Sequence, residues 1–254
     1  MIITIDIGNS RVKLAQWQAS VIVARSVQAY GDKNLSDVFD ELFTGIKKPE
    51  KIFAVCVSGD ENRKTLANWV ERQWQLPVGF LKTEKRFGDI VNAYDDPSHH
   101  GADRWAGLIA SHQLFPDAAV CVIGAGTAIT FDLMDGDGGH LGGYILPSYV
   151  TMHQSLLGDT ANINSDLSAK YIDNKKVPNN TNDAVNDGLH KLLQAGVREL
   201  CSSATSVLGS SVKIIITGGF AQTILSYPEV PEMHHQPDLV MQGLYVVMNK
   251  VQVK

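Results

Sequence analysis

The chain has 254 residues, 44% of them hydrophobic and 19% charged, with a formal net charge of −5. This length suits one large domain or two of about 100–150 residues with a substantial core, and the acidic balance argues against a nucleic-acid partner, whose binding surface is normally basic. No apolar run approaches the roughly 20 residues that span a bilayer, and no basic leader precedes the first strand pattern, so we expect neither a membrane partner nor a secretory signal peptide.

Strand and helix patterns alternate along the first half of the chain. Period-2 alternation predicts strands at residues 2–6 and 12–17, joined as a hairpin by the turn Gly8-Asn9-Ser10. A buried apolar run predicts a strand at residues 51–57, and turn formers predict a loop at residues 92–101. Helical spacing of apolar residues predicts helices at residues 36–45, 60–74 and 103–114.

The second half begins with a repeat of the first hairpin. Residues 3–9, Ile-Thr-Ile-Asp-Ile-Gly-Asn, are echoed by residues 121–127, Cys-Val-Ile-Gly-Ala-Gly-Thr, and alternating residues follow both segments. Two strand–turn–strand units about half a chain apart indicate an internal duplication. The remaining patterns predict a helix at residues 182–208, a strand at 213–217 and a last helix at 241–247.

Interleaved strands and helices predict an α/β fold. The repeat divides the chain near Phe115 without a low-complexity linker, so we expect an N-terminal domain of residues 1–115 and a C-terminal domain of residues 116–254. Two hairpins that face one another across a nucleotide cleft are typical of the actin, sugar-kinase and heat-shock ATPase superfamily. We therefore expect two duplicated actin-like (ribonuclease H-like) domains.

The first hairpin carries residues suited to phosphate. A strand that ends in a glycine turn exposes successive backbone N–H groups, which hold phosphate oxygens, and Lys13 adds a mobile positive charge. Asp6 suits Mg²⁺, which prefers a carboxylate together with waters and substrate phosphates. A plain hairpin turn explains Gly8-Asn9-Ser10 equally well when this segment is taken alone. The second glycine turn, at residues 124–127, favours the phosphate interpretation, and the P-loop and GxGxxG patterns are absent from the sequence.

The segment Gly101-Ala102-Asp103-Arg104 is a second candidate site. Asp103 could cap the helix that follows, since Asp is a favoured N-cap residue. A kinase that acts on an alcohol needs instead a carboxylate to accept the hydroxyl proton, and Arg104 could hold an anionic or polar substrate with its planar set of donors. The residue types alone leave both interpretations open.

The cysteines indicate the redox environment. Cys56, Cys121 and Cys201 are odd in number and far apart, and no CxxC pair is present. Neither a disulfide framework nor a structural zinc site is supported by this spacing. We expect buried thiols in a reducing cytoplasm.

Taken together, these motifs resemble those of the type III pantothenate kinases. The matching segments follow the family order over nearly the whole chain: Asp6-x-Gly-Asn-Ser with Lys13, Tyr94, Gly101-Ala102-Asp103-Arg104, Gly126-Thr127-Ala128-x-Thr130-x-Asp132, Gly142-Gly143-x-Ile145-x-Pro147, Thr181 and Thr217-Gly218-Gly219. The resemblance implies an ATP-dependent kinase that converts pantothenate to 4′-phosphopantothenate, the first step of coenzyme A biosynthesis. It also implies a cytoplasmic homodimer.

The resemblance assigns roles to individual residues. ATP phosphates would be bound by Asp6, Ile7, Gly8, Asn9, Ser10, Arg11, Val12 and Lys13, with Asp6 near Mg²⁺, and ATP would also contact Thr127 of the second hairpin. Asp103 would be the general base of an in-line phosphoryl transfer. Pantothenate would be contacted by Tyr94, Gly101, Ala102, Asp103, Arg104 and Thr181, the last of which reaches a dimer interface in this family.

The chain departs from the family pattern at two positions. The family commonly has Asp where this chain has Gly124, and that carboxylate helps to bind a monovalent cation, so the resemblance leaves open whether a K⁺ or NH₄⁺ site is replaced or absent in this chain. Ser148 follows Pro147 where glycine is more usual, and we expect only a local change of turn geometry. Two alternative functions stay open: a nucleotide-binding regulatory protein of the same family, and a kinase of another small alcohol.

Overall fold

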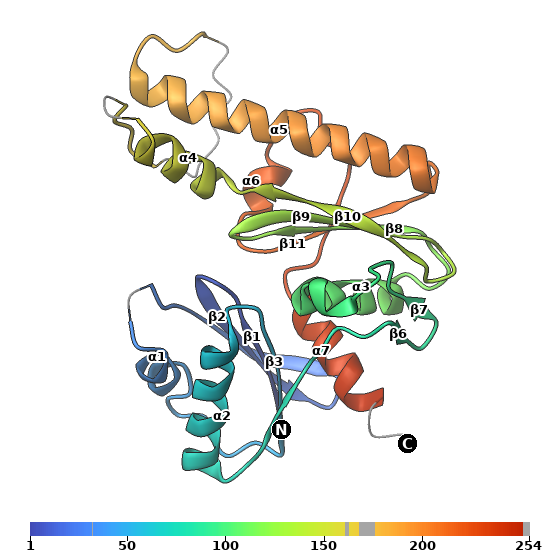
Figure 1. The fold of residues 1–254 in the computed structure, drawn as a ribbon. Coiled ribbons are helices and arrows are strands. Elements are labelled where there is room, and N and C mark those ends of the chain that lie inside the picture. Colours follow the sequence, from blue (N-terminus) through green and yellow to red (C-terminus); the bar gives the residue numbers. More distant parts are fainter. Residues whose placement is uncertain (32, 161–162, 168–175, 251–254) are drawn as a thin grey trace. The chain divides into compact units, whose positions relative to one another are not determined.

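The computed structural model describes residues 1–31, 33–160, 163–167 and 176–250, and the chain divides into two compact units (Figure 1). Unit 1 comprises Met1–Gly88, Tyr94–Leu114 and Asp238–Lys254, and unit 2 comprises Asp89–Ala93 and Phe115–Pro237. Compact units need not coincide with duplicated domains, so the division of the chain between residues 115 and 116 stays a prediction.

Unit 1 is built on a mixed five-stranded sheet in the order β3-β2-β1-β4-β5. Its strands are β1 (Ile2–Ile7), β2 (Arg11–Gln18), β3 (Val21–Ala29), β4 (Lys51–Cys56) and β5 (Val78–Phe80), with a short separate strand β6 (Arg86–Phe87). Its helices are α1 (Leu35–Leu42), α2 (Asp60–Trp74), the short 3₁₀ helix Pro97–His99, α3 (Ala102–Leu114) and α7 (Leu239–Lys250). Strand β1 runs antiparallel to β2 and parallel to β4, so the first hairpin lies at the centre of the sheet.

Alternation along β1 sends its side chains to two different environments. The isoleucines at odd positions are fully buried in an apolar cluster with residues of α1 and α2, and they are Ile3, Ile5 and Ile7. Thr4 and Asp6 point to the opposite face because side chains alternate along a strand. On that face Thr4 Oγ1 donates a hydrogen bond to Met241 Sδ of α7 at 3.3 Å. Asp6 therefore lies on the face of the sheet that α7 covers.

Helices α3 and α7 lie side by side in unit 1 (Figure 1). A Cβ atom at Gly243 of α7 would lie 2.0 Å from the carbonyl oxygen of Ala106 in α3, so only glycine permits this approach. Since α7 also contacts β1 through Met241, this packing fixes the start of α3 relative to the sheet.

Unit 2 repeats the arrangement, with a five-stranded sheet in the order β10-β9-β8-β11-β12. Its strands are β8 (Val120–Ala125), β9 (Ala128–Met134), β10 (His140–Pro147), β11 (Lys213–Thr217) and β12 (His234–His235), with a short strand β7 (Ile90–Val91). Its helices are α4 (Tyr149–Gly158), α5 (Thr181–Leu208) and α6 (Ala221–Leu225). An apolar cluster of strand and helix residues that includes Ile123, Phe131 and Val197 forms its core, and α5 runs across the sheet (Figure 1).

The two sheets share one topology. β8 is antiparallel to β9 and parallel to β11, as β1 is to β2 and β4. The duplication and the α/β fold predicted from the sequence are confirmed. Asp6 and Gly124 occupy equivalent places: Asp6 pairs with Lys13 on the neighbouring strand, and Gly124 pairs with Thr130.

Most predicted elements are present, and several further elements were missed, among them β3 and α4. The predicted helix at 60–74 and strand at 213–217 coincide with α2 and β11. Strand β3 was missed because Val21, Val23 and Val27 are exposed, so apolar residues stand on both of its faces and hide the alternation. Helix α4 was missed although Ser148 is its N-cap, with Ser148 Oγ accepting from Thr151 N at 3.2 Å. Among the described residues, no helix is long and apolar enough to cross a membrane.

Candidate active site

The turn between β1 and β2 is tightly held and presents its polar residues to solvent. Gly8 N donates to Arg11 O at 3.1 Å and closes the hairpin. From the other side, the Tyr30 hydroxyl donates to Gly8 O at 2.5 Å. Asn9 and Ser10 at the tip are exposed. A turn whose backbone is held by hydrogen bonds and whose tip is exposed suits the binding of an anion by backbone and side-chain donors.

Asp6, at the end of β1, is a buried carboxylate with a cation beside it. Its exposed fraction is 8%, and Lys13 Nζ lies 3.7 Å from Asp6 Oδ2. Burial raises the pKa of Asp6 from 3.8 to about 6, Lys13 opposes that rise, and the charge of Asp103 adds to it. At neutral pH Asp6 is therefore mainly ionised, and it senses Asp103 electrostatically.

Asp103 stands in the first turn of α3. The first helical hydrogen bond runs from Trp105 N to Gly101 O at 3.0 Å, so Gly101 precedes the helix and the N-cap interpretation of Asp103 is wrong. The Asp103 carboxylate accepts a hydrogen bond from Arg104 N at 2.8 Å. A Cβ atom at position 101 would lie 2.8 Å from Asp103 Oδ1, so glycine there leaves the carboxylate its space. The start of α3 therefore contains the whole segment Gly101-Ala102-Asp103-Arg104, with Gly101 directly before the helix.

Tyr94 and Arg104 interact directly. Arg104 Nη1 donates to the Tyr94 hydroxyl at 3.3 Å, and the guanidinium carbon lies 6.0 Å from the centroid of the Tyr94 ring. Lys85 Nζ donates to the backbone oxygen of Tyr94 at 2.9 Å. The planar donors of Arg104 suit a carboxylate or an amide oxygen. Tyr94 and Arg104 belong to unit 1, as do Asp6, Lys13 and Asp103.

The glycine turn of unit 2 contains Thr127. Gly126 N donates to Ala128 O at 3.0 Å, and Thr151 Oγ1 donates to Thr127 O at 3.0 Å, so both the strand and α4 hold the turn. The Thr127 side chain is exposed. Behind the turn Gly218 has φ +102°, and a Cβ atom there would lie 2.2 Å from Ala125 O, so the chain requires glycine at this crossing.

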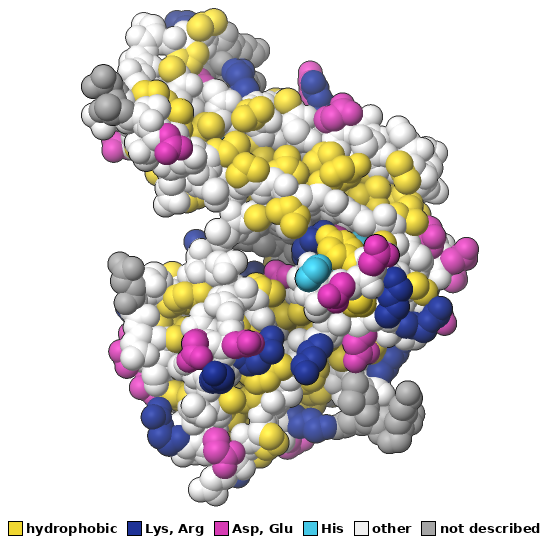
Figure 2. All heavy atoms as spheres, in the orientation of Figure 1, with side chains coloured by type: hydrophobic (Ala, Val, Ile, Leu, Met, Phe, Trp, Pro, Cys, Tyr) yellow, Lys and Arg dark blue, Asp and Glu magenta, His cyan; other side chains and the backbone are white. Residues whose placement is uncertain are grey.

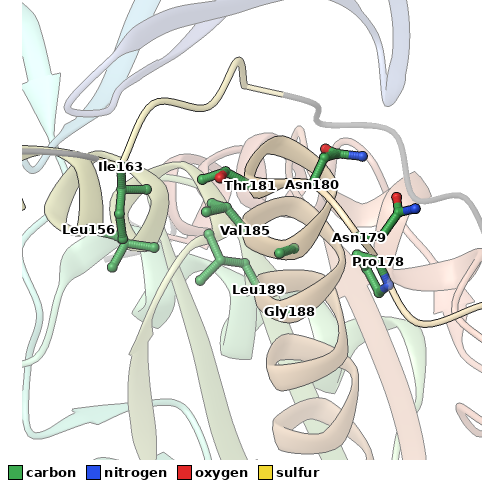
Figure 3. A pocket seen from close by; sticks show the side chains of 10 residues that line it. Leu156, Ile163, Pro178, Asn179, Asn180, Thr181, Val185, Gly188 and Leu189 are labelled. Carbon is green, nitrogen blue, oxygen red and sulfur yellow. The ribbon is translucent and has the colours of Figure 1, made fainter.

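Thr181 is the first residue of α5 and lines an open pocket of about 570 Å³ in unit 2 (Figure 3). Apolar side chains such as Leu156, Val185 and Leu189 form most of the pocket wall, and Asn180 stands beside Thr181. Asn180 Oδ1 accepts from Asp183 N at 2.9 Å and caps the helix. Among the predicted site residues, Thr127 and Thr181 belong to unit 2, and all others belong to unit 1.

Three supporting residues were missed by sequence reasoning. Tyr30 holds the turn between β1 and β2, Lys85 holds the backbone of Tyr94, and His100 stacks on the Tyr94 ring with centroids 4.8 Å apart. Tyr30 and Lys85 belong to segments whose own patterns carry no sign of a site. These contacts depend on tertiary structure alone.

Known proteins that are similar to this chain include type III pantothenate kinases. A family model described as type III pantothenate kinase matches residues 2–203. A type III pantothenate kinase of Nitrosococcus oceani is 31% identical over 248 residues, which cover 96% of this chain and 92% of that protein.

Two solved structures show the same fold. A Campylobacter jejuni protein placed in the Baf family of transcriptional activators has a TM-score of 0.59 at 23% identity, with 98% of each chain covered. The activator of 2-hydroxyisocaproyl-CoA dehydratase from Clostridium difficile, solved with ADPNP bound, has a TM-score of 0.53 at 12% identity and covers 100% of this chain and 98% of its own. These similarities confirm the expected actin-like architecture.

The raised pKa of Asp6 has a consequence for stability. Between its unfolded value of 3.8 and about 6, the folded state binds more protons than the unfolded state, so folding stability falls as pH rises through this window. We predict that Asp6→Asn raises the free energy of unfolding by about 2–3 kcal/mol near pH 7.5, and that the gain vanishes below about pH 4. Denaturant melts at both pH values measure this difference.

The exposed Asp95 offers a matched control, because Asp95→Asn removes the same charge without removing a buried group. It should change the unfolding free energy little at either pH. A gain for Asp6→Asn that is the same at both pH values would show that burial of the carboxylate is not its cause.

Proposed function

Because the chain belongs to the type III pantothenate kinase family, we propose that it transfers the γ-phosphoryl group of ATP to the primary hydroxyl of pantothenate. The products are 4′-phosphopantothenate and ADP, and the reaction opens coenzyme A biosynthesis. The observation that carries the proposal is the electrostatic coupling of Asp6 and Asp103 in unit 1, beside Lys13. A purely regulatory nucleotide-binding protein would not require both carboxylates and the lysine, so that alternative is not favoured.

We propose that the hairpin from Asp6 to Lys13 binds the ATP phosphates. Its closed turn and its exposed tip support this role, and Lys13 supplies positive charge for the terminal phosphate. Thr127 is the proposed ATP contact in unit 2, where its side chain is exposed on a glycine turn equivalent to the first.

The residues also fit Mg²⁺. Asp6 is a carboxylate whose pKa of about 6 leaves it ionised at neutral pH, and it lies next to the proposed phosphate turn. Mg²⁺ accepts one or two carboxylates together with waters and phosphate oxygens. Asp6 would hold it, directly or through water, and when bound the ion neutralises charge on the phosphates.

We propose that Asp103 is the general base. It accepts the proton of the pantothenate hydroxyl as the oxygen bonds to the γ-phosphorus, while the bond to the bridging oxygen breaks and ADP leaves. Tyr94, Gly101, Ala102, Arg104 and Thr181 bind pantothenate. Arg104 with its planar donors suits the substrate's carboxylate or amide, and its hydrogen bond to Tyr94 limits its orientation. Alignment and charge stabilisation supply most of the rate in such transfers.

A K⁺ or NH₄⁺ ion fits poorly at Gly124. The residue offers no carboxylate, and a side chain there would begin 2.6 Å from Thr130 Oγ1, so the threonine hydroxyl fills the adjacent space. We propose that this chain binds no monovalent cation at Gly124.

We propose that the protein is a homodimer through unit 2. Figure 2 shows hydrophobic side chains gathered over α5 and β10. Among them Tyr144, Ile145 and Leu192 have exposed fractions of 49%, 64% and 61%. Exposed apolar surface of this kind marks protein–protein contacts. Leu192 and Thr181 belong to the same helix, α5, and Thr181 is its first residue. An interface along α5 would therefore extend to the pocket that Thr181 lines.

We propose a cytoplasmic location. Cys56, Cys121 and Cys201 are all buried free thiols, and burial raises the pKa of Cys201 to about 12. Three unpaired thiols suit a reducing compartment. Recovery of the protein from the periplasm in a cell fractionation would contradict this location.

The first prediction concerns the reaction itself. Purified protein with Mg²⁺ and ATP should release ADP only when pantothenate is added, and at the same rate in Na⁺, K⁺ and NH₄⁺ buffers. ADP is quantified directly by chromatography. Other small alcohols in place of pantothenate serve as controls. ADP release independent of pantothenate would contradict the proposed substrate, and a rate confined to K⁺ or NH₄⁺ would contradict the proposal for Gly124.

A second prediction concerns Asp103. Loss of a general base typically lowers kcat by about 10²–10⁴-fold, so Asp103→Asn should show this loss while the KM for ATP changes little. Asp95→Asn, a change at an exposed carboxylate in the loop before α3, is the control and should retain wild-type turnover. Turnover of pantothenate by Asp103→Asn near the wild-type rate would remove Asp103 from the mechanism.

A third prediction concerns the dimer. Leu192→Glu places a charge on the exposed apolar surface of α5 and should convert the dimer to a monomer in sedimentation equilibrium. Val21→Glu is a matched control in unit 1, because Val21 is 62% exposed and Leu192 is 61% exposed. It should leave the dimer intact. A monomeric wild-type protein, or a dimer that persists in Leu192→Glu, would contradict the interface.

A further inference from the structure

A column of rings supports Tyr94 in unit 1. The imidazole of His100 stacks on the Tyr94 ring at a centroid distance of 4.8 Å and an interplanar angle of 21°. On its other side His100 meets Trp105 edge to face at 6.0 Å and 69°. His100 is 1% exposed, and Trp105 is also 1% exposed and belongs to the core. The column therefore runs from the core to the proposed substrate residue.

The backbone on both sides of this stack is held independently of the rings. Thr83 Oγ1 donates to His100 O at 2.7 Å, and His100 N donates to Pro97 O at 3.0 Å. Lys85 Nζ donates to Tyr94 O at 2.9 Å. These bonds fix the backbone from which each ring extends. The face of His100 then limits the orientation of the Tyr94 ring.

The orientation of the Tyr94 ring affects the position of the Arg104 guanidinium. The Tyr94 hydroxyl accepts a hydrogen bond from Arg104 Nη1 at 3.3 Å, and the guanidinium carbon lies 6.0 Å from the ring centroid. Arginine has many rotamers, and a planar partner reduces the freedom lost when a ligand binds. A tilt of the Tyr94 ring would move both the hydroxyl and the ring face that Arg104 contacts.

We propose that His100 is a positioning residue for substrate recognition: its ring sets the orientation of Tyr94 and, through Tyr94, of the Arg104 guanidinium that binds pantothenate. This inference rests on the proposed function, which places Tyr94 and Arg104 at the substrate. In this role His100 acts through Tyr94 and Arg104, so its effect falls on the phosphoryl acceptor, pantothenate, and not on the nucleotide.

The test compares variants by calorimetric binding of pantothenate and by steady-state kinetics. An aromatic pair contributes an amount that corresponds to about 3- to 10-fold in affinity. His100→Ala should weaken pantothenate binding and raise its KM by this factor, with the KM for ATP unchanged and kcat within about twofold. His100→Phe keeps a flat ring and should restore pantothenate binding to within about twofold. His99→Ala, on the neighbouring residue with a 77% exposed side chain, is the control and should have no effect.

A double-mutant cycle separates positioning from general destabilisation. If His100 acts through Tyr94, His100→Ala should have no further effect on pantothenate binding in a Tyr94→Ala background. Additive losses in the cycle would overturn the inference, as would unchanged pantothenate affinity in His100→Ala. If His100→Ala does not fold, His100→Gln removes the ring at similar volume and enters the same cycle with the same expected and contradicting results.

Arg104→Ala distinguishes failure of this inference from failure of the proposed site. Weak pantothenate binding in Arg104→Ala together with wild-type binding in His100→Ala would overturn only the role of His100. Unchanged binding in Arg104→Ala would overturn the substrate site and, with it, the role of His100.

Discussion

The proposed site in unit 1 depends on one buried carboxylate, Asp6, which is attracted by the ammonium of Lys13 and repelled by the charge of Asp103. Burying an ionised group is unfavourable unless opposite charge compensates it, and here burial outweighs Lys13, since the pKa rises to about 6. A fold selected for stability alone would place an apolar residue at this position. The carboxylate faces away from the isoleucine core of β1, on the side of the sheet that α7 covers, and α7 packs against α3, which carries Asp103. Perturbed carboxylates of this kind cluster at functional sites.

The two units share one fold, but most residues of the proposed site belong to unit 1. Both units use one sheet topology, and both end their central strand in a glycine turn. Their charges have diverged. Asp6 pairs with Lys13 in β1 and β2, whereas the equivalent pair in β8 and β9 is Gly124 with Thr130, which is neutral. In the proposed site, the first hairpin would supply charge for phosphate and Mg²⁺, and the second would supply a glycine turn with Thr127.

The sequence predicted the central strands and the duplication well, because a strand buried on one face has a clear alternation and the two hairpins repeat it. It failed at β3, whose valines stand on the exposed face opposite Ile22 and Ala24, and at α4, whose start depends on the cap Ser148. Among the proposed site residues, the sequence motifs pointed to the turn after β1 and to Asp103. Only the structure showed that Asp103 lies inside α3 and is not its N-cap. The supports from Tyr30 and His100 arise from tertiary contacts that no local pattern encodes.

The most direct test of this account is the titration of Asp6 itself, followed by carboxyl-carbon NMR with Asp6 assigned through Asp6→Asn. The account predicts a midpoint of about 6, well above the value of 3.8 for an unburied carboxyl. It also predicts a lower midpoint in Asp103→Asn, because the repulsion from Asp103 is then absent. A midpoint near 3.8 in the wild-type protein, or one that is unchanged in Asp103→Asn, would contradict the coupled pair of carboxylates on which the proposed active site rests.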